Sequence, residues 1–402
     1  MKNILLITNI YPNNDPEYAG TKVCHSFTTE WVKQGYNIRV IHFDSLFPRP
    51  YYWIGKILKS RIQARTGCVA YTNTSRKPKQ YVIDDVPVLF VPLKKYIPHK
   101  APSREQTTKA FRFIVDTFKN ERYIPDVITA HFTMPQLQFL PLFKKKYPQV
   151  RTCLVMHGSG SELPYFYPNS YQNLMPSVDV WGFRSLAFKQ DFEQCFGNAR
   201  HSFICYSGIP EKYIETKPKN FCQGVKRFVF VGSLYKLKNV DVTICSLKKA
   251  FENNDCHFDI VGGGAEYEHL RNLVTELGMQ KSVTFYGQKK RDEAQTIIKE
   301  ADCFVMVSSR EAFGLVYLEA MAKGCVVIGT KGQGIDGVII NGENGFLCEA
   351  GKADELATLI KHINTLPSSE LQRISENAIQ TARKLTDENA AKMYIDDVTA
   401  RL

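Results

Sequence analysis

Short apolar runs recur along this chain with helical patterns between them, and this alternation constrains the fold more than any other feature. Residues 3–9 form the first run, and Val23, Phe27 and Trp31 then recur every fourth residue, as on one face of a helix. Such short, nearly continuous apolar runs are typical of strands buried on both faces of a parallel sheet. The other runs of this series cover residues 37–43, 126–131, 151–157, 179–183 and 202–206. The alternation predicts a doubly wound α/β sheet.

A second series of runs begins at residue 227, after a polar stretch without periodicity at residues 212–224. Its runs cover residues 227–232, 258–264, 283–287, 303–307 and 325–328. A chain of 402 residues also exceeds what one hydrophobic core usually supports. We therefore predict an α/β protein with a first doubly wound domain over residues 1–206, a linker over residues 207–224 and a second doubly wound domain over residues 225–384.

The net charge and the cysteine pattern indicate which binding partners and which cellular compartment to expect. The formal net charge is +12, which favours an anionic partner such as a nucleotide, a phospholipid surface or a nucleic acid. No groove-reading or base-stacking motif supports nucleic acid, so we expect none. The eleven cysteines show no metal-ligand spacing, and the chain enters its first strand without a signal peptide, which favours a reducing cytoplasm. No apolar run is long enough to cross a bilayer.

The segment Ser308–Ala322 places two carboxylates, Glu311 and Glu319, around a Phe-Gly turn that follows an apolar strand and opens a helix. Ligands of parallel sheets bind at the carboxyl ends of strands. The first amides of a helix have no intrahelical acceptor, so those of Phe313, Gly314 and Leu315 can bind an anion. These amides could bind a phosphate or a sugar oxygen, and the two carboxylates could accept hydrogen bonds from hydroxyl groups. The segment therefore predicts a sugar-nucleotide site.

This segment resembles the Glu–seven residues–Glu signature of the retaining glycosyltransferases of family four, which include bacterial enzymes of surface-polysaccharide synthesis. Residues 324–329, 341–347 and 354–357 follow the same family's C-terminal pattern. The resemblance implies the GT-B fold, in which two Rossmann-like domains face each other across a cleft. It also implies that the donor nucleotide binds the second domain, that the acceptor binds the first, and that the last helix, residues 385–402, packs back on the first domain.

The resemblance assigns catalytic positions in both domains. Glu311 would face the donor sugar, and Glu319 would hold the ribose hydroxyls. His157, after the strand at residues 151–156, would contact the donor sugar as in the family's strand-His-Gly element. His131 also ends a strand. For His131, a structural role and a ligand contact both remain open.

Three further donor-binding positions follow from the resemblance. Gly20 would let the backbone approach the donor phosphate or the acceptor closely. Gly232 and Lys238 correspond to the family's first phosphate-binding loop, in which a lysine neutralises the donor diphosphate. Many members have an arginine directly after that glycine, whereas this chain has Ser233. Lys238 is then the main expected cation. We expect Gly262–Gly264 to let a loop pack closely around the nucleotide base.

The expected reaction is transfer of a hexosyl-type residue from a nucleoside-diphosphate sugar, with retention implied by the resemblance. The helix start at Phe313–Leu315 and Lys238 would stabilise the departing diphosphate. The chain has no Asp-x-Asp motif, so we expect neither a divalent metal nor any other cofactor.

Two basic, aromatic stretches bear on the acceptor. Residues 49–65 and 109–119 interleave aromatic and aliphatic residues with cations, as an interfacial helix does. They favour peripheral attachment of the protein to the anionic inner face of the cell membrane. The acceptor would then be a sugar or a lipid-linked oligosaccharide, in cell-surface polysaccharide or capsule synthesis. The alternative is that Trp53 and its apolar neighbours pack into the core while the cations are solvated.

Other functions remain open at this stage. A GT-B-like sugar-nucleotide epimerase or phosphorylase would share the fold, although the segment around Glu311 and Glu319 disfavours it. A dehydrogenase is disfavoured because Gly262–Gly264 fits only part of a dinucleotide fingerprint and lacks a well-placed acidic residue after it. A nucleic-acid-binding protein is suggested by charge alone.

Overall fold

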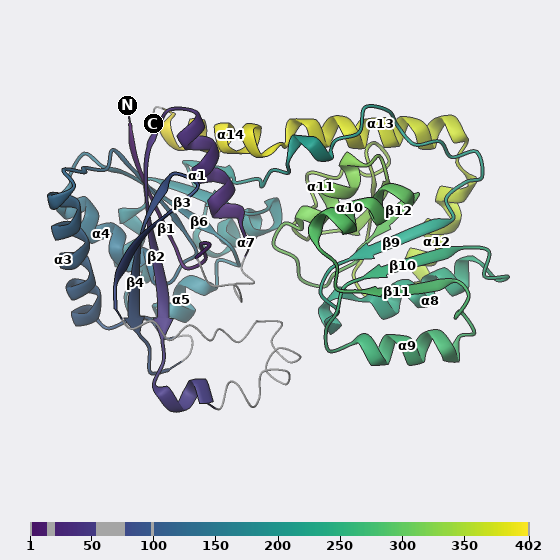
Figure 1. Ribbon diagram of the computed structural model, residues 1–402, viewed down its shortest axis with the longest axis horizontal. Coiled ribbons are helices and arrows are strands. Elements are labelled where there is room, and N and C mark those ends of the chain that lie inside the picture. Colours follow the sequence, from purple (N-terminus) through teal and green to yellow (C-terminus); the bar gives the residue numbers. More distant parts are fainter. Residues whose placement is uncertain (1, 14–20, 54–76, 98–99, 401–402) are drawn as a thin grey trace. The chain divides into compact units, whose positions relative to one another are not determined.

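The computed structural model describes residues 2–13, 21–53, 77–97 and 100–400, which form two compact units (Figure 1). The first unit contains the described residues of Met1–Lys59, Val69–Tyr206 and Asp387–Leu402, and the second contains Ser207–Thr386. The stretch expected as a linker, residues 207–224, is part of the second unit. There Glu211–Tyr213 forms a 3-10 helix, and the Lys219 amide donates to Ser375 Oγ at 3.0 Å.

The first unit is built on an eight-stranded sheet in the order β3-β4-β2-β1-β5-β6-β7-β8. Its strands are β1 (Asn3–Thr8), β2 (Asn37–Leu46), β3 (Lys79–Ile83), β4 (Val86–Lys94), β5 (Val127–His131), β6 (Arg151–Met156), β7 (Val180–Phe183) and β8 (Ser202–Ile204). All neighbours pair in parallel except β3 and β4. The strands predicted for the first series are confirmed. The β3–β4 hairpin is an addition that the sequence analysis missed.

Helices cover both faces of this sheet, as the apolar runs require (Figure 1). One face carries α1 (Val23–Lys33) and the C-terminal α14 (Asp387–Thr399), whose buried residues share one core cluster. There the Trp31 indole donates to the Ala391 carbonyl at 2.8 Å. The other face carries α3 (Arg104–Asn120), α4 (Gln136–Lys146), α5 (Glu162–Phe166), α6 (Tyr171–Leu174) and α7 (Leu186–Phe196).

The second unit has a six-stranded, all-parallel sheet in the order β11-β10-β9-β12-β13-β14. Its strands are β9 (Arg227–Val231), β10 (His257–Val261), β11 (Val283–Gly287), β12 (Cys303–Val305), β13 (Val326–Thr330) and β14 (Phe346–Cys348). Its helices are α8 (Val240–Ala250), α9 (Tyr267–Glu276), α10 (Arg291–Glu300), α11 (Leu315–Ala322), α12 (Ala353–Thr365) and α13 (Ser368–Lys384). The second predicted series of strands is therefore confirmed as well.

Each sheet has a point at which the strand order reverses. In the first unit it lies between β1 and β5, and in the second between β9 and β12. The connections after two such strands leave the sheet toward opposite sides, which opens a crevice at their carboxyl ends. The loops after β1, β5, β9 and β12 are therefore the places to look for ligand-binding residues.

The basic, aromatic stretches have different outcomes. In α3, Ile114 and Phe118 are buried in the core, while Phe113 is exposed. Residues 49–53 are helical, and there Tyr52 is buried whereas Trp53 is 70% exposed. Residues 54–65 lie outside the described part of the chain. None of the described helices is both long enough and apolar enough to cross a membrane.

Candidate active site

The loop after β9 is shaped by glycines of a neighbouring loop. Gly232 follows β9, and a short 3-10 helix at Lys236–Lys238 leads into α8. Gly262 has a φ of +147°, and a Cβ there would lie 1.8 Å from the Gly232 carbonyl oxygen. At Gly264 a Cβ would lie 2.4 Å from the Leu234 carbonyl oxygen. The Gly262–Gly264 run was expected to pack around a base. In the structure Gly262 and Gly264 pack against the backbone of Gly232 and Leu234 in the loop after β9.

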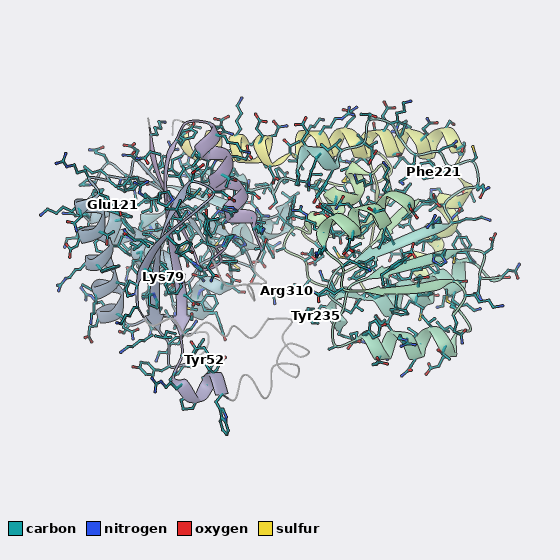
Figure 2. All side chains as sticks on the ribbon, viewed as in Figure 1. Tyr52, Lys79, Glu121, Phe221, Tyr235 and Arg310 are labelled. Carbon is teal, nitrogen blue, oxygen red and sulfur yellow. The ribbon has the colours of Figure 1, made fainter. Side chains whose placement is uncertain are left out.

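The loop after β12 is hydrogen-bonded to the loop after β9. The Ser309 amide donates to the Leu237 carbonyl at 2.8 Å. The buried Asn239 amide group donates to the Val307 carbonyl at 2.7 Å and to Ser309 Oγ at 2.8 Å. Figure 2 shows Tyr235 and Arg310, one from each loop, at the same edge of the second unit. The two loops that flank the reversal of strand order thus form one surface.

Lys238 and Glu311 meet on this surface. Lys238 Nζ lies 2.5 Å from Glu311 Oε2, and both side chains are largely buried, at 21% and 16% exposure. A partly desolvated ion pair interacts more strongly than one in bulk water. The sequence analysis placed Lys238 at the diphosphate and Glu311 at the sugar. The structure brings these two side chains into direct contact.

The backbone of Glu311 is held by the loop after β13. Its amide donates to Gln333 Oε1 at 3.1 Å, and its carbonyl accepts from the Gly334 amide at 3.0 Å. A Cβ at Gly334 would lie 2.4 Å from the Phe313 nitrogen, so only glycine allows this approach. The segment before α11 is therefore fixed by close backbone packing.

Helix α11 begins directly after this segment. Gly314 is its N-cap, with a φ of +81°, and Leu315 is its first residue. The side chain of Phe313 is 3% exposed and belongs to the core, so a ligand would contact this residue through its backbone. The first amides of α11 lack intrahelical acceptors and follow Glu311, the partner of Lys238, by a few residues in the chain. These free amides are donors suited to an anion, whereas the Lys238 charge is balanced by Glu311 in the absence of a ligand.

Glu319 is held inside the second unit. It is 7% exposed, and its Oε1 accepts from Arg291 Nε at 2.9 Å and from Arg291 Nη2 at 2.7 Å. Its Oε2 accepts from Gln295 Nε2 at 2.5 Å. Both partners lie on α10, and the sequence analysis missed them. A ribose that bound Glu319 would have to share the carboxylate with these donors or displace one of them.

The candidate residues of the first unit lie at the ends of β5 and β6. His157, half-buried, follows β6, and its Nε2 lies 2.9 Å from His131 Nδ1. Phe132 stacks on the His157 ring with centroids 3.9 Å apart. Burial lowers the pKa of His131 to about 3 and also lowers that of His157, so both rings are neutral at physiological pH. Gly20 lies outside the described residues.

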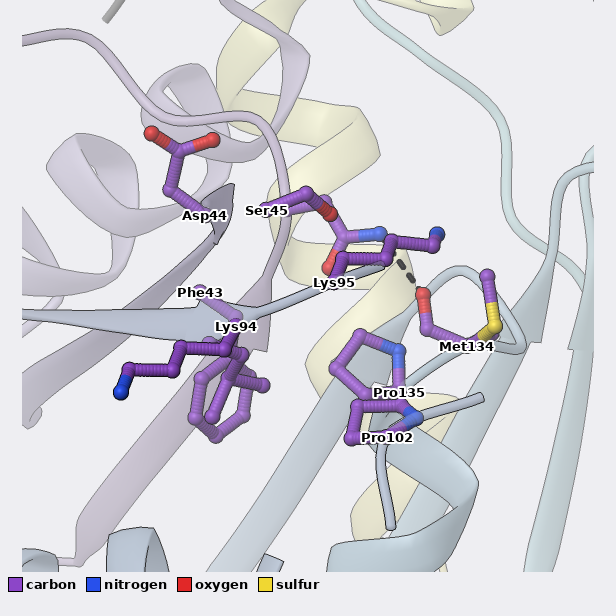
Figure 3. A pocket seen from close by; sticks show the side chains of 10 residues that line it. Phe43, Asp44, Ser45, Lys94, Lys95, Pro102, Met134 and Pro135 are labelled. Atoms are coloured by element: carbon purple, nitrogen blue, oxygen red, sulfur yellow. Dashed lines mark hydrogen bonds between the residues drawn. The ribbon is translucent and has the colours of Figure 1, made fainter. Parts of the chain in front are cut away.

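A small pocket lies at the carboxyl ends of strands in the first unit (Figure 3). It encloses roughly 40 Å³, enough for one small polar group, and is lined by Asn9, Phe43, Asp44, Ser45, Leu93, Lys94, Lys95, Pro102, Met134 and Pro135. The Asn9 side chain donates to the Met134 carbonyl at 2.7 Å in its wall. Burial raises the pKa of Asp44 to about 7 and lowers the pKa of Lys95.

Metal ligands were not expected, and the described residues contain no group of three or more His, Cys, Asp or Glu side chains arranged to hold an ion. The carboxylates Glu311 and Glu319 each face cationic partners instead.

Comparison with known proteins finds glycosyltransferases. Residues 213–381 match the family described as glycosyl transferases group 1. An uncharacterised glycosyltransferase of Methanocaldococcus jannaschii is 24% identical over 307 residues, which cover 73% of this chain and 82% of that protein. Two solved structures cover all of this chain and are covered completely by it. They are WaaB, a lipopolysaccharide outer core galactosyltransferase in its apo form (TM-score 0.70, 16% identity), and HepE of Anabaena in complex with UDP (TM-score 0.69, 18% identity).

At these identities the two structures establish the fold, which is GT-B. The family match covers most of the second unit, the one that carries Lys238, Glu311 and Glu319. The chain is therefore a glycosyltransferase of the GT-B fold, and its second unit matches the family described as glycosyl transferases group 1.

Proposed function

We propose that this glycosyltransferase moves a hexosyl residue from a nucleoside-diphosphate sugar to a sugar or lipid-linked sugar acceptor, with retention of anomeric configuration. One observation carries the proposal. A lysine suited to a diphosphate and a carboxylate suited to a sugar hydroxyl lie 2.5 Å apart at the reversal point of the second sheet, beside a helix start. Diphosphate and sugar are adjacent groups of such a donor.

The arrangement suits departure of a nucleoside diphosphate. Negative charge develops on the leaving phosphate, where Lys238 and the first amides of α11 would stabilise it without reorganisation. Positive character develops at the anomeric carbon, where the Glu311 carboxylate would be favourable. In this proposal Glu319 accepts from the ribose hydroxyls, and His157 contacts the donor sugar. All of this chemistry uses protein groups, so we propose transfer without a metal ion, which activity retained in excess EDTA would support.

The donor base and the acceptor class draw support from similar proteins. HepE is solved with UDP, which makes UDP-sugars the first donors to test. WaaB acts in the lipopolysaccharide outer core, which supports an acceptor of the surface-polysaccharide class. We also propose a cytoplasmic protein attached peripherally to the inner face of the membrane, because Tyr51 and Trp53 are 42% and 70% exposed beside the basic stretch. Flotation with anionic vesicles, lost in high salt, tests this attachment.

The test combines donor screening with a matched pair of variants. Thermal stabilisation by UDP-, GDP- and ADP-sugars identifies the donor, because a ligand that binds the folded state raises its stability. Transfer is then measured for Glu311→Gln and for Glu252→Gln, a carboxylate on the exposed surface. We expect Glu311→Gln to lose about 100-fold or more in kcat and Glu252→Gln to match the wild type. Equal transfer by both variants contradicts the proposed site.

A further inference from the structure

A tyrosine of the C-terminal helix is connected to His157 through a second histidine. Tyr394 lies on α14 and is 1% exposed. Its hydroxyl lies 3.1 Å from His131 Nε2, and His131 Nδ1 lies 2.9 Å from His157 Nε2. These three side chains come from α14, the end of β5 and the residue after β6, all within the first unit. They form a continuous chain of two hydrogen bonds.

The chemistry of the end group sets the direction of these hydrogen bonds. Burial raises the pKa of Tyr394 well above its ordinary value, so the phenol keeps its proton and needs an acceptor. Within the described residues, the geometry gives this hydroxyl a hydrogen bond to His131 Nε2. The neutral His131 ring then carries its proton on Nδ1 and donates to His157 Nε2. Neutral His157 must in turn carry its proton on Nδ1.

The packing around His157 limits other arrangements of its ring. Phe132, stacked on the ring at 3.9 Å, has a φ of +73°, which is rare for a bulky residue. Such strained backbone persists where surrounding structure enforces it, and it often accompanies functional sites. On the neighbouring loop, Gly158 lies so close to Glu162 that a Cβ would be 1.9 Å from a carboxylate oxygen. The stacked Phe132 ring thus covers one face of the His157 ring, and the backbone after His157 is closely packed against Glu162.

We propose that Tyr394 and His131 are positioning residues that hold His157 as the Nδ1–H tautomer, so that its Nδ1–H can donate to an oxygen of the transferred sugar. Only the donation from His157 to the sugar rests on the proposed function. The tautomer itself is a property of the free protein. Through this chain of hydrogen bonds, the last helix would set the donor or acceptor character of a group that contacts the substrate.

The test reads the tautomer directly. Nitrogen-15 NMR of histidine-labelled protein, with the His157 signals assigned from a His157→Gln variant, should show the proton on Nδ1. A proton on Nε2 overturns the inference. The tautomer itself is read on the wild type, and the variant serves only to assign the His157 signals.

Tyr394→Phe removes the phenol and leaves His131 Nε2 without its donor. We expect the His157 tautomer to shift toward Nε2–H and kcat to fall about tenfold with KM little changed, which corresponds to one lost hydrogen bond. Tyr123→Phe is the control, because Tyr123 is also a buried tyrosine of this unit and its hydroxyl has no partner among the described residues. It should change neither quantity.

The outcomes separate the two proposals. An unchanged tautomer in Tyr394→Phe, or a loss of kcat equal to that of Tyr123→Phe, overturns the positioning role. If Glu311→Gln transfers sugar normally while the His157 tautomer shifts as expected, the proposed function fails and the hydrogen-bond chain stands.

Discussion

At the scale of single residues, the contact between Lys238 and Glu311 is the central feature. Their side chains neutralise each other at 2.5 Å on a surface made by two loops. A bound diphosphate would compete with Glu311 for the lysine charge, so donor binding exchanges one ionic contact for another. Lys238 should therefore matter more for binding a diphosphate than for binding a nucleoside.

Lys238→Met tests this charge while it keeps most of the side-chain length. We expect affinity for the nucleoside diphosphate to fall about tenfold, or 1.4 kcal/mol, with little change for the nucleoside alone. Titration calorimetry with UDP and uridine measures both, if the donor is a UDP-sugar. Lys236→Met is the control, because Lys236 is exposed and pairs with Asp241. An equal effect of both variants on diphosphate binding would rule out a special role for Lys238.

His42 gives a pH-dependent prediction for the first unit. Burial lowers its pKa from 6.5 to about 4. As the pH falls below 6.5 the unfolded chain binds a proton that folded His42 does not bind, so folding stability falls. The contribution of neutral His42 to the free energy of unfolding is fully present above pH 6.5. It is lost between pH 6.5 and pH 4, at about 1.4 kcal/mol per pH unit.

Unfolding free energy measured from pH 7 to pH 4 should therefore fall less steeply in His42→Gln than in the wild type. His42 contacts the Asn9 carbonyl and the Tyr81 hydroxyl, so the variant will be less stable at every pH, and the slope is the diagnostic quantity. His362→Gln, at an exposed position, should keep the wild-type slope. Parallel slopes in all three proteins would refute the role of His42.

Some site residues could be identified from the sequence because a local pattern places them, whereas others are placed only by tertiary packing. Glu311 and His157 follow recognisable strands, so their place at the carboxyl end of a sheet could be predicted from local pattern and family resemblance. Arg291 reaches Glu319 from another helix, and Tyr394 reaches His131 across 263 residues of sequence. Such pairings depend on tertiary packing, which leaves no periodic signal in the chain.

At the scale of elements, the parallel strands were predictable because each is a short apolar run between turn residues. The β3–β4 hairpin was missed, since its turn is formed by Asp84 and Asp85 at φ values of 45° and 62° rather than by the Asn-Gly or Gly-rich pairs that usually mark a hairpin. The last helix was expected on the first domain from resemblance, and the structure groups α14 with the first unit. Its buried residues alone do not say which sheet they cover.

The Gly262–Gly264 run offers a sharp test at this scale. Gly262→Ala would force a Cβ to within 1.8 Å of the Gly232 carbonyl, whereas Gly263 has nothing within 4 Å of its Cβ position and an ordinary φ. We expect Gly262→Ala to lower the free energy of unfolding by about 3 kcal/mol or more and to weaken donor binding. Gly263→Ala should change the free energy by less than about 0.5 kcal/mol. Denaturant unfolding of both variants, followed by donor titration, distinguishes them; similar losses would refute this packing.

At the scale of the whole molecule, two parallel sheets each offer a crevice where the strand order reverses. The second carries the family match and the paired Lys238 and Glu311, and the first carries His157 with its hydrogen-bonded partners. Under the proposed function, the second unit binds the donor and the first unit binds the acceptor. The net charge of +12 suits the anionic donor.

Hydrogen exchange of the intact chain, with and without a saturating nucleoside diphosphate, shows whether the loops after β9 and β12 bind the donor. We expect protection to increase chiefly in residues 232–240 and 308–317. Peptides from α3 should exchange as before. Tight binding that leaves both loops unprotected, or that protects another region of the second unit instead, would show that the diphosphate does not bind at Lys238 and Glu311.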